Sequence, residues 1–234
     1  MTATITDVKE NILLFYQAML DDPYHRYRSW EHCYTFFQQH YPFPNDDQLD
    51  TATLHLAFYL ASWGMYRGSS QLLQKNYRVH TSILKIILKK EYAKLFDISF
   101  DNGRSVSPVV RLIFDLVQEL RHAYSGLGIS PTTTLVTKVL LGTYGCIPAY
   151  DRLFIEGVKF WKIMPDEYQP KFPALFGVNS YLGLVDFYHC HEEDILAVQA
   201  VTSQKSIKYP IMKLIDMYFW NLGYQSYGEN DDLE

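Results

Sequence analysis

The chain has 234 residues, of which 48% are hydrophobic and 16% are aromatic. This composition excludes disorder for most of the chain, and the length allows one large domain or two small ones. The formal net charge of −5 excludes a protein that binds nucleic acid through a uniformly basic surface, because phosphate binding depends on clustered Lys and Arg. A local basic face is compatible with it.

The cysteines and the apolar runs indicate the compartment. Cys33, Cys146 and Cys190 show neither disulfide nor metal-motif spacing, which favours a reducing cytoplasm. No hydrophobic leader is visible near the N-terminus, so we expect a cytoplasmic protein without a targeting signal. The longest apolar run, residues 54–65, is too short for a bilayer span, so no membrane partner is expected. We predict no cofactor and leave the oligomeric state open.

Three helices are predicted in the first part of the chain. Residues 7–20 form an amphipathic pattern that ends at an Asp-Asp-Pro break. Residues 24–39 carry a stripe of aromatic side chains that is typical of a core. Residues 50–63 are apolar on every side, which predicts a central helix that is buried over most of its surface.

The loop after this third helix resembles an anion-binding loop. It contains two glycines, and we predict binding roles for Arg67, Gly68, Ser69 and Ser70. Glycine lets the backbone approach a ligand, a guanidinium binds oxygens in pairs, and a serine at a helix start adds donors. The alternative is an ordinary pair of helix caps, with Arg67 paired to a nearby acid.

Residues 80–96 are predicted as one amphipathic helix with a concentration of lysines: Lys85, Lys89, Lys90 and Lys94. Such a face suits a phosphate backbone or simply solvent. Asn102-Gly103 indicates a loop, and a further helix is expected over residues 107–124.

Residues 130–161 form a helix, a tight turn and a second helix, around which we expect the other segments to pack. Ser130-Pro131 predicts the first helix start, and Gly142 with Gly145 predicts its end. The turn leads to Asp151, whose carboxylate is favoured at the start of the next helix.

This hairpin resembles the core of the helix-hairpin-helix DNA glycosylase superfamily. A helix with a lysine is followed by a short turn and by Ile147-Pro148-Ala149-Tyr150-Asp151, which is similar to a hydrophobic-Pro-x-Asp step with one further residue before the aspartate. The resemblance implies that Lys138 attacks the sugar carbon and that Asp151 steadies positive charge or activates the nucleophile. Tyr144, Tyr150 and Trp161 are then candidates for aromatic walls around a flipped base.

The chain departs from the family at the hairpin that binds a DNA phosphate. Residues 132–135 stand in place of its Gly-hydrophobic-Gly turn, and the nearest such triplet, residues 126–128, lies upstream. An ordinary helical hairpin in which Asp151 is a cap remains the alternative.

The last part of the chain is also predicted to be helical, over residues 176–188, 195–201 and 209–222. His189 to Asp194 contains many potential metal ligands, but neighbouring helical residues diverge, so we predict no metal site. Asp216 lies in an apolar helix and needs a partner, for which Lys213 or a distant arginine is the candidate. Residues 225–234 are expected to form an acidic frayed tail.

The sequence therefore predicts an all-α fold, a helical globular domain over residues 1–224. It is either a single compact multi-helix domain or two packed helical halves that meet near residues 97–107. The first functional hypothesis is an intracellular binding protein that engages a nucleic acid or a protein partner. The alternative is a DNA glycosylase or lyase that uses Lys138 and Asp151.

Overall fold

The computed structural model describes residues 7–43, 45–67, 70–98, 100, 108–205 and 207–231, with side chains at all of them except 205 and 227–231. These residues form helices, turns and irregular segments and no strands, which confirms the all-α prediction. None of the helices in these ranges combines the length and apolarity that a bilayer span requires.

The chain divides into two compact units. Unit 1 combines the described residues of Met1–Pro23 and Ile147–Glu234 with Phe100, and unit 2 combines those of Tyr24–Ser99 and Ser107–Cys146. The division therefore does not fall into an N-terminal and a C-terminal half, because the segment after residue 107 returns to unit 2.

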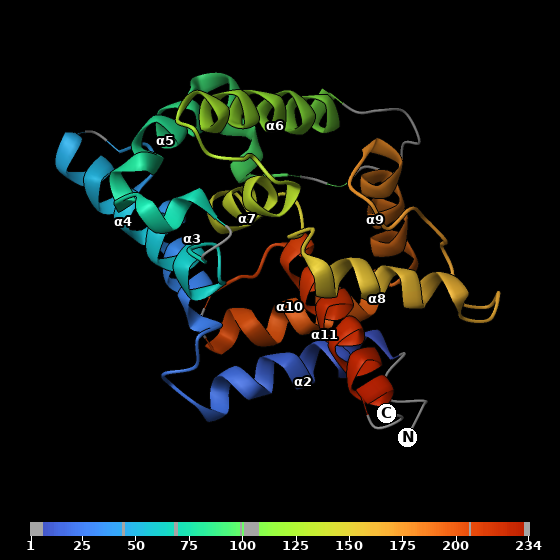
Figure 1. Cartoon of the computed structure of the whole chain (residues 1–234). Helices are drawn as coiled ribbons and strands as arrows, with labels where there is room; N and C mark the ends of the chain where they lie inside the picture. Colours follow the sequence, from blue (N-terminus) through green and yellow to red (C-terminus); the bar gives the residue numbers. More distant parts are fainter. Residues whose placement is uncertain are drawn as a thin grey trace. The chain divides into compact units, whose positions relative to one another are not determined.

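Unit 1 is built on the crossing of two helices. Its elements are α2 (Val8–Asp21), α8 (Arg152–Ile163), α9 (Val178–Cys190), α10 (Glu192–Lys205) and α11 (Ile211–Asp231). α8 crosses α11, and α2 packs against α10 and α11 (Figure 1). α11 extends beyond the predicted residue 222 and into the predicted acidic tail.

Two glycines bring the backbones of α8 and α11 into contact. A Cβ added at Gly157 would lie 1.9 Å from the carbonyl oxygen of Phe219. A Cβ added at Gly223 would lie 2.0 Å from the carbonyl oxygen of Leu153. The crossing therefore requires residues without side chains at both positions. Aromatic rings of Trp161, Phe187 and Phe219 fill the space beside it.

Unit 2 contains the remaining described elements. They are α3 (Arg28–His40), α4 (Asp46–Ser62), the short 3-10 helices η1 (Gln71–Gln74), η2 (Tyr77–His80) and η3 (Lys90–Phe96), α5 (Thr81–Ile87), α6 (Pro108–Gly126) and α7 (Thr133–Thr143). α7 packs against α3, α4 and α6, and its residues 135–143 are all buried. α7 is thus the central helix of this unit.

Several predicted helices differ in detail. The single helix over 80–96 is wrong: the segment breaks into η2, α5 and η3, so the four lysines do not share one helix face. α7 begins two residues later than predicted, because Thr132 rather than Ser130 accepts the first-turn hydrogen bond, from the Leu135 N–H. Gly142 lies inside α7 against Tyr59, and Gly145, at φ 68°, follows the end.

α4 is less buried than predicted. It begins at Asp46, with Asn45 as its cap, and buries Ala52, Leu56 and Leu60. Its other side leaves Leu54 and Phe58 52% and 60% exposed. An all-round apolar pattern therefore did not imply all-round burial, because neighbours cover only one side of this helix.

Candidate functional site

The C-terminus of α4 ends in a Schellman motif that sets up the predicted anion-binding loop. Trp63 is the cap, and Gly64 follows in the left-handed conformation at φ 74°. The Gly64 N–H donates to the Ala61 carbonyl, and the Met65 N–H donates to the Leu60 carbonyl. This closure turns the chain sharply and presents the Trp63 ring at the start of the loop.

The Trp63 ring carries an aromatic neighbour and two cations. Tyr27 stacks on it with ring centroids 5.0 Å apart and an interplanar angle of 17°. The Arg26 guanidinium lies 5.4 Å from the centre of the Tyr27 ring and 5.8 Å from that of Trp63. The Lys138 Nζ lies 5.3 Å from the Trp63 ring. These contacts are within cation–π range and hold the charges beside aromatic faces. We call Arg26, Tyr27, Trp63 and Lys138 the Trp63 cluster.

Lys138 reaches the cluster from α7. Its Nζ donates a hydrogen bond to the Trp63 carbonyl oxygen at 3.2 Å, and the residue is 4% exposed. The ammonium therefore gives the carbonyl at the end of α4 a hydrogen-bond donor and connects α7 to the start of the loop. The structure brings together two sequence-predicted features, the lysine of α7 and the loop that contains Arg67.

Arg67 packs back over the turn. A Cβ added at Gly64 would lie 2.4 Å from a guanidinium nitrogen of Arg67, so that guanidinium lies against the Gly64 backbone. Arg67 is exposed, whereas Ser70 caps η1 by accepting from the Leu72 N–H at 3.2 Å. Gly68 and Ser69 lie outside the described residues. Arg67, an exposed residue, thus lies four positions after Trp63, with its guanidinium against the turn.

A buried histidine anchors the same loop. The Tyr66 hydroxyl lies 2.8 Å from His80 Nε2, and the other ring nitrogen, Nδ1, lies 2.9 Å from the Tyr124 hydroxyl. His80 has no exposed surface, and burial lowers its pKa to about 4. A neutral imidazole can donate to one hydroxyl and accept from the other, so both bonds are satisfied in the uncharged form. Burial also raises the pKa of Tyr66 to about 12.

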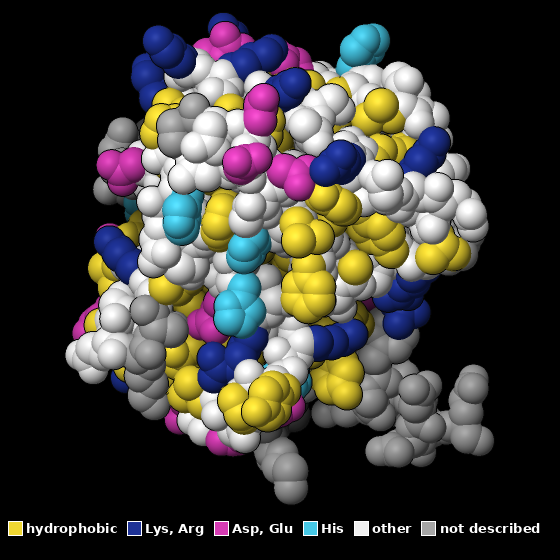
Figure 2. All heavy atoms as spheres, turned by 90° about the vertical axis from the view of Figure 1, so that its left-hand side faces the viewer, with side chains coloured by type: hydrophobic (Ala, Val, Ile, Leu, Met, Phe, Trp, Pro, Cys, Tyr) yellow, Lys and Arg dark blue, Asp and Glu magenta, His cyan; other side chains and the backbone are white. Residues whose placement is uncertain are grey.

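The chain leading into α3 adds further aromatic and basic side chains. Tyr24 is 92% exposed, and His25 lies edge-on to Tyr27 at 4.2 Å. Arg28 pairs with Glu31 at 3.4 Å. Figure 2 shows the face of the molecule on which Lys and Arg, histidine and hydrophobic side chains lie next to one another.

Tyr144 and Tyr150, the tyrosines predicted to flank a flipped base, are both buried. Tyr144, the cap of α7, donates to the Ile87 carbonyl and packs edge-on against Phe96. Tyr150 belongs to unit 1, and its hydroxyl lies 2.8 Å from the Ser180 hydroxyl. The two residues are 2% and 1% exposed, so the structure gives them roles in the two cores.

Asp151 caps α8. Its Oδ1 accepts from the Phe154 N–H at 3.1 Å, as the helix-cap interpretation expects. Asp151 belongs to unit 1 and Lys138 to unit 2. The two residues proposed from the glycosylase resemblance thus come from different units.

Metal ligands do not converge in the part of the chain that the structure describes. No three His, Cys, Asp or Glu side chains there are arranged to hold an ion. His189 and Cys190 end α9, and Glu192, Glu193 and Asp194 form the first turn of α10. The carboxylates thus lie where the helix dipole favours negative charge.

Comparison with protein-family models, curated proteins and solved structures found no match. The resemblance to helix-hairpin-helix glycosylases therefore stays a prediction, and the candidate site rests on its own geometry.

Sequence reasoning missed Arg26, Tyr27, Trp63 and His80. A local signal was present for the first two, because residues 24–28 combine two tyrosines with three basic side chains: Tyr-His-Arg-Tyr-Arg. Aromatic and basic side chains together are used in contacts with single-stranded nucleic acid. The pairing of this segment with Trp63 depends on tertiary packing, and no spacing in the sequence indicates it.

Proposed function

We propose that this protein binds single-stranded nucleic acid through the Trp63 cluster and the adjoining Arg67 loop, without performing chemistry on it. The observation that carries the proposal is the stack of Arg26, Tyr27 and Trp63 at the start of the loop that contains the exposed residue Arg67. Planar cations beside aromatic rings combine the two contacts that such ligands need, stacking on bases and charge on phosphates.

Single strands fit this arrangement better than a duplex. Bases in a duplex are already stacked and offer no face to an aromatic side chain, whereas unpaired bases do. Tyr24, 92% exposed, offers such a face three residues before Tyr27. The net charge of −5 confines phosphate contacts to a local basic patch.

The lysines of residues 85–94 support the proposal less well. They are divided between α5 and η3 and the residues that join them. The Lys89 ammonium lies 2.6 Å from a carboxylate oxygen of Glu119, which neutralises its charge locally. Arg26 and Arg67 are therefore the cations that we expect to contact phosphate.

The proposal is tested by fluorescence anisotropy with a labelled oligo-dT of roughly 15 nucleotides, within the range of single-strand site sizes. Binding should weaken with salt. Arg26→Ala or Arg67→Ala should each reduce the slope of log K against log salt by about 0.7, the value for one phosphate that is no longer neutralised. Tyr24→Ala should cost roughly 1–3 kcal/mol if a base stacks there.

Arg111→Ala is the matched control, because Arg111 is an exposed arginine of α6 in the same unit. It should leave both affinity and salt slope unchanged. No binding at low ionic strength, or an equal loss of affinity for Arg111→Ala, would reject the proposal. Borohydride treatment with an oligonucleotide that carries an abasic site separates binding from lyase chemistry, because a Schiff base is reduced to a stable cross-link, and one at Lys138 would be lost in Lys138→Ala.

A further inference from the structure

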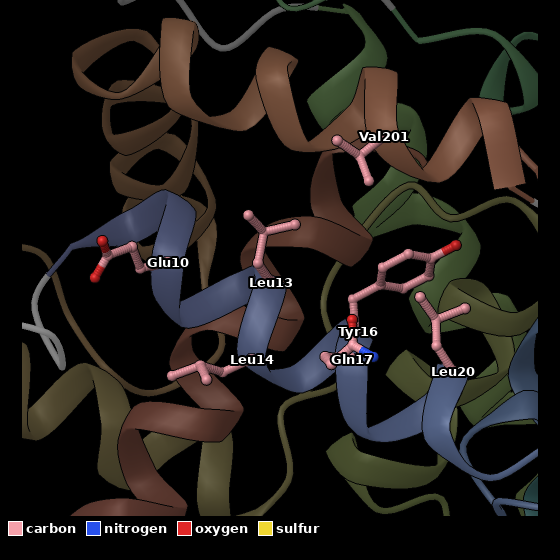
Figure 3. A pocket seen from close by; sticks show the side chains of 7 residues that line it. All are labelled: Glu10, Leu13, Leu14, Tyr16, Gln17, Leu20 and Val201. Carbon is pink, nitrogen blue, oxygen red and sulfur yellow. The ribbon is translucent and has the colours of Figure 1, made fainter.

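A second surface, in unit 1, is hollowed between α2 and α10. The hollow has a volume of about 430 Å³ (Figure 3). Its lining consists of six residues of α2 and one of α10: Glu10, Leu13, Leu14, Tyr16, Gln17, Leu20 and Val201. Figure 3 shows Leu13 and Val201 pointing toward one another across the space between the two helices.

The lining of this hollow is mainly apolar and open to solvent. Leu14 is 53% exposed, whereas Tyr16 is 2% exposed and rests edge-on against Tyr209, with ring centroids 5.7 Å apart. The lining residues of α2 lie on one helix face, because Glu10, Leu13, Gln17 and Leu20 follow one another at the three-to-four spacing of such a face. The segment from Glu10 to Leu20 spans three helical turns, roughly 15 Å. The surface is therefore an elongated apolar groove rather than a closed cavity.

Carboxylates gather at one end of the groove. Glu10 lines it directly, Asp7 caps α2, and α10 begins with Glu192, Glu193 and Asp194. Burial lowers the pKa of His191, and the charges of Asp194 and Asp7 both oppose that shift. Because both aspartates act on His191, which directly precedes α10, the starts of α2 and α10 lie at the same end of the groove. The first turn of α2 also contains one basic residue, Lys9.

Carboxylates also lie at the opposite end of the groove, where α2 ends. Asp21 closes α2 and accepts a hydrogen bond from the Gln17 side-chain amide at 2.6 Å, and Asp22 follows. An apolar floor between two acidic ends is complementary to a ligand that has an apolar stripe and positive charge toward its ends.

We propose that this groove docks a cationic amphipathic helix from a partner protein. Such a helix presents anchors at positions i, i+3 or i+4, and i+7, which match a groove three turns long. Its lysines or arginines would meet Glu10 at one end and Asp21 at the other. An anionic amphiphile such as a fatty acid would meet the same carboxylates and be repelled.

The test uses a synthetic helical peptide of leucine and lysine, roughly 12 residues long so that it covers the three turns, with fluorescence anisotropy on the full chain. We expect binding that weakens with salt, and an anionic peptide with glutamate in place of lysine should bind at least about tenfold more weakly. Leu14→Gln should weaken binding about tenfold by removing an exposed apolar contact. Glu10→Gln should reduce the salt dependence.

Leu54→Gln is the matched control, because Leu54 is 52% exposed and Leu14 is 53% exposed. It lies on α4 in unit 2 and should leave peptide affinity unchanged. Equal losses of affinity for Leu14→Gln and Leu54→Gln, equal binding of the anionic peptide, or no peptide binding would each overturn the proposal. Far-ultraviolet circular dichroism of each variant shows that the fold is retained.

Discussion

Lys213 and Asp216 form an ion pair inside unit 1, with Nζ and Oδ2 2.9 Å apart and side chains 3% and 6% exposed. The other carboxylate oxygen accepts from the Ala149 N–H at 2.9 Å, just before the cap of α8. The partner expected from the sequence is thus confirmed. Burial raises the pKa of Asp216, and Lys213 opposes the shift.

Asp216→Ala should lower the free energy of unfolding by about 3–5 kcal/mol, because it removes the carboxylate from a buried ammonium and from a buried amide. Replacing both residues by apolar ones, Lys213→Met with Asp216→Leu, should recover much of that loss. Urea denaturation of the three proteins measures it. If Asp216→Ala were as stable as the wild type, the ion pair with Lys213 would not contribute to the stability of the fold.

Acidification should destabilise unit 2 through His80. Its pKa in the folded protein is about 4, below the ordinary 6.5, so the unfolded chain binds more protons between these values. The free energy of unfolding should therefore fall as pH drops from 6.5 to 4, by roughly 3 kcal/mol in total. His80→Gln should flatten this part of the profile. Chemical denaturation at a series of pH values tests it, and an unchanged slope in the variant would argue against His80.

Asp151→Ala should cost about 0.5–2 kcal/mol, the usual loss when a helix cap is removed. Asp151→Asn keeps an oxygen for the Phe154 N–H and should recover most of that stability. Thermal melts compare the three proteins. If both substitutions raised the melting temperature instead, the carboxylate would be a group placed for function at the expense of stability.

Gly157→Ala should destabilise the crossing of α8 and α11 by about 1–3 kcal/mol, because the added methyl group meets the Phe219 carbonyl and the helices must move apart. Gly126→Ala is the control. An added Cβ there meets nothing within 4 Å, so it should be neutral or slightly stabilising. If urea denaturation showed equal losses of stability for the two variants, the close crossing of α8 and α11 would not be the reason that position 157 requires glycine.

The helical periodicity was sufficient to predict most elements and the all-α class, because each amphipathic stripe is a local property. The loop at Arg67 and the lysine of α7 could also be singled out from their immediate neighbours in the sequence. The sequence did not predict that the Arg67 loop and Lys138 meet at Trp63. Lys138 is 75 positions away from Trp63, whose carbonyl oxygen accepts its hydrogen bond. The break after Leu88 escaped as well, because the apolar spacing of residues 80–96 continues through it.

The discontinuity of unit 1 affects the order in which the chain can acquire its structure during synthesis. All segments of unit 2 have left the ribosome once residue 146 is clear, whereas α2 packs against α10 and α11, which are made much later than α2 itself. At the usual rates of translation, α2 waits on the order of ten seconds or more for these helices. Apolar side chains of α2 that are buried in the finished fold, such as Ile12, Phe15 and Met19, are therefore uncovered during every round of synthesis.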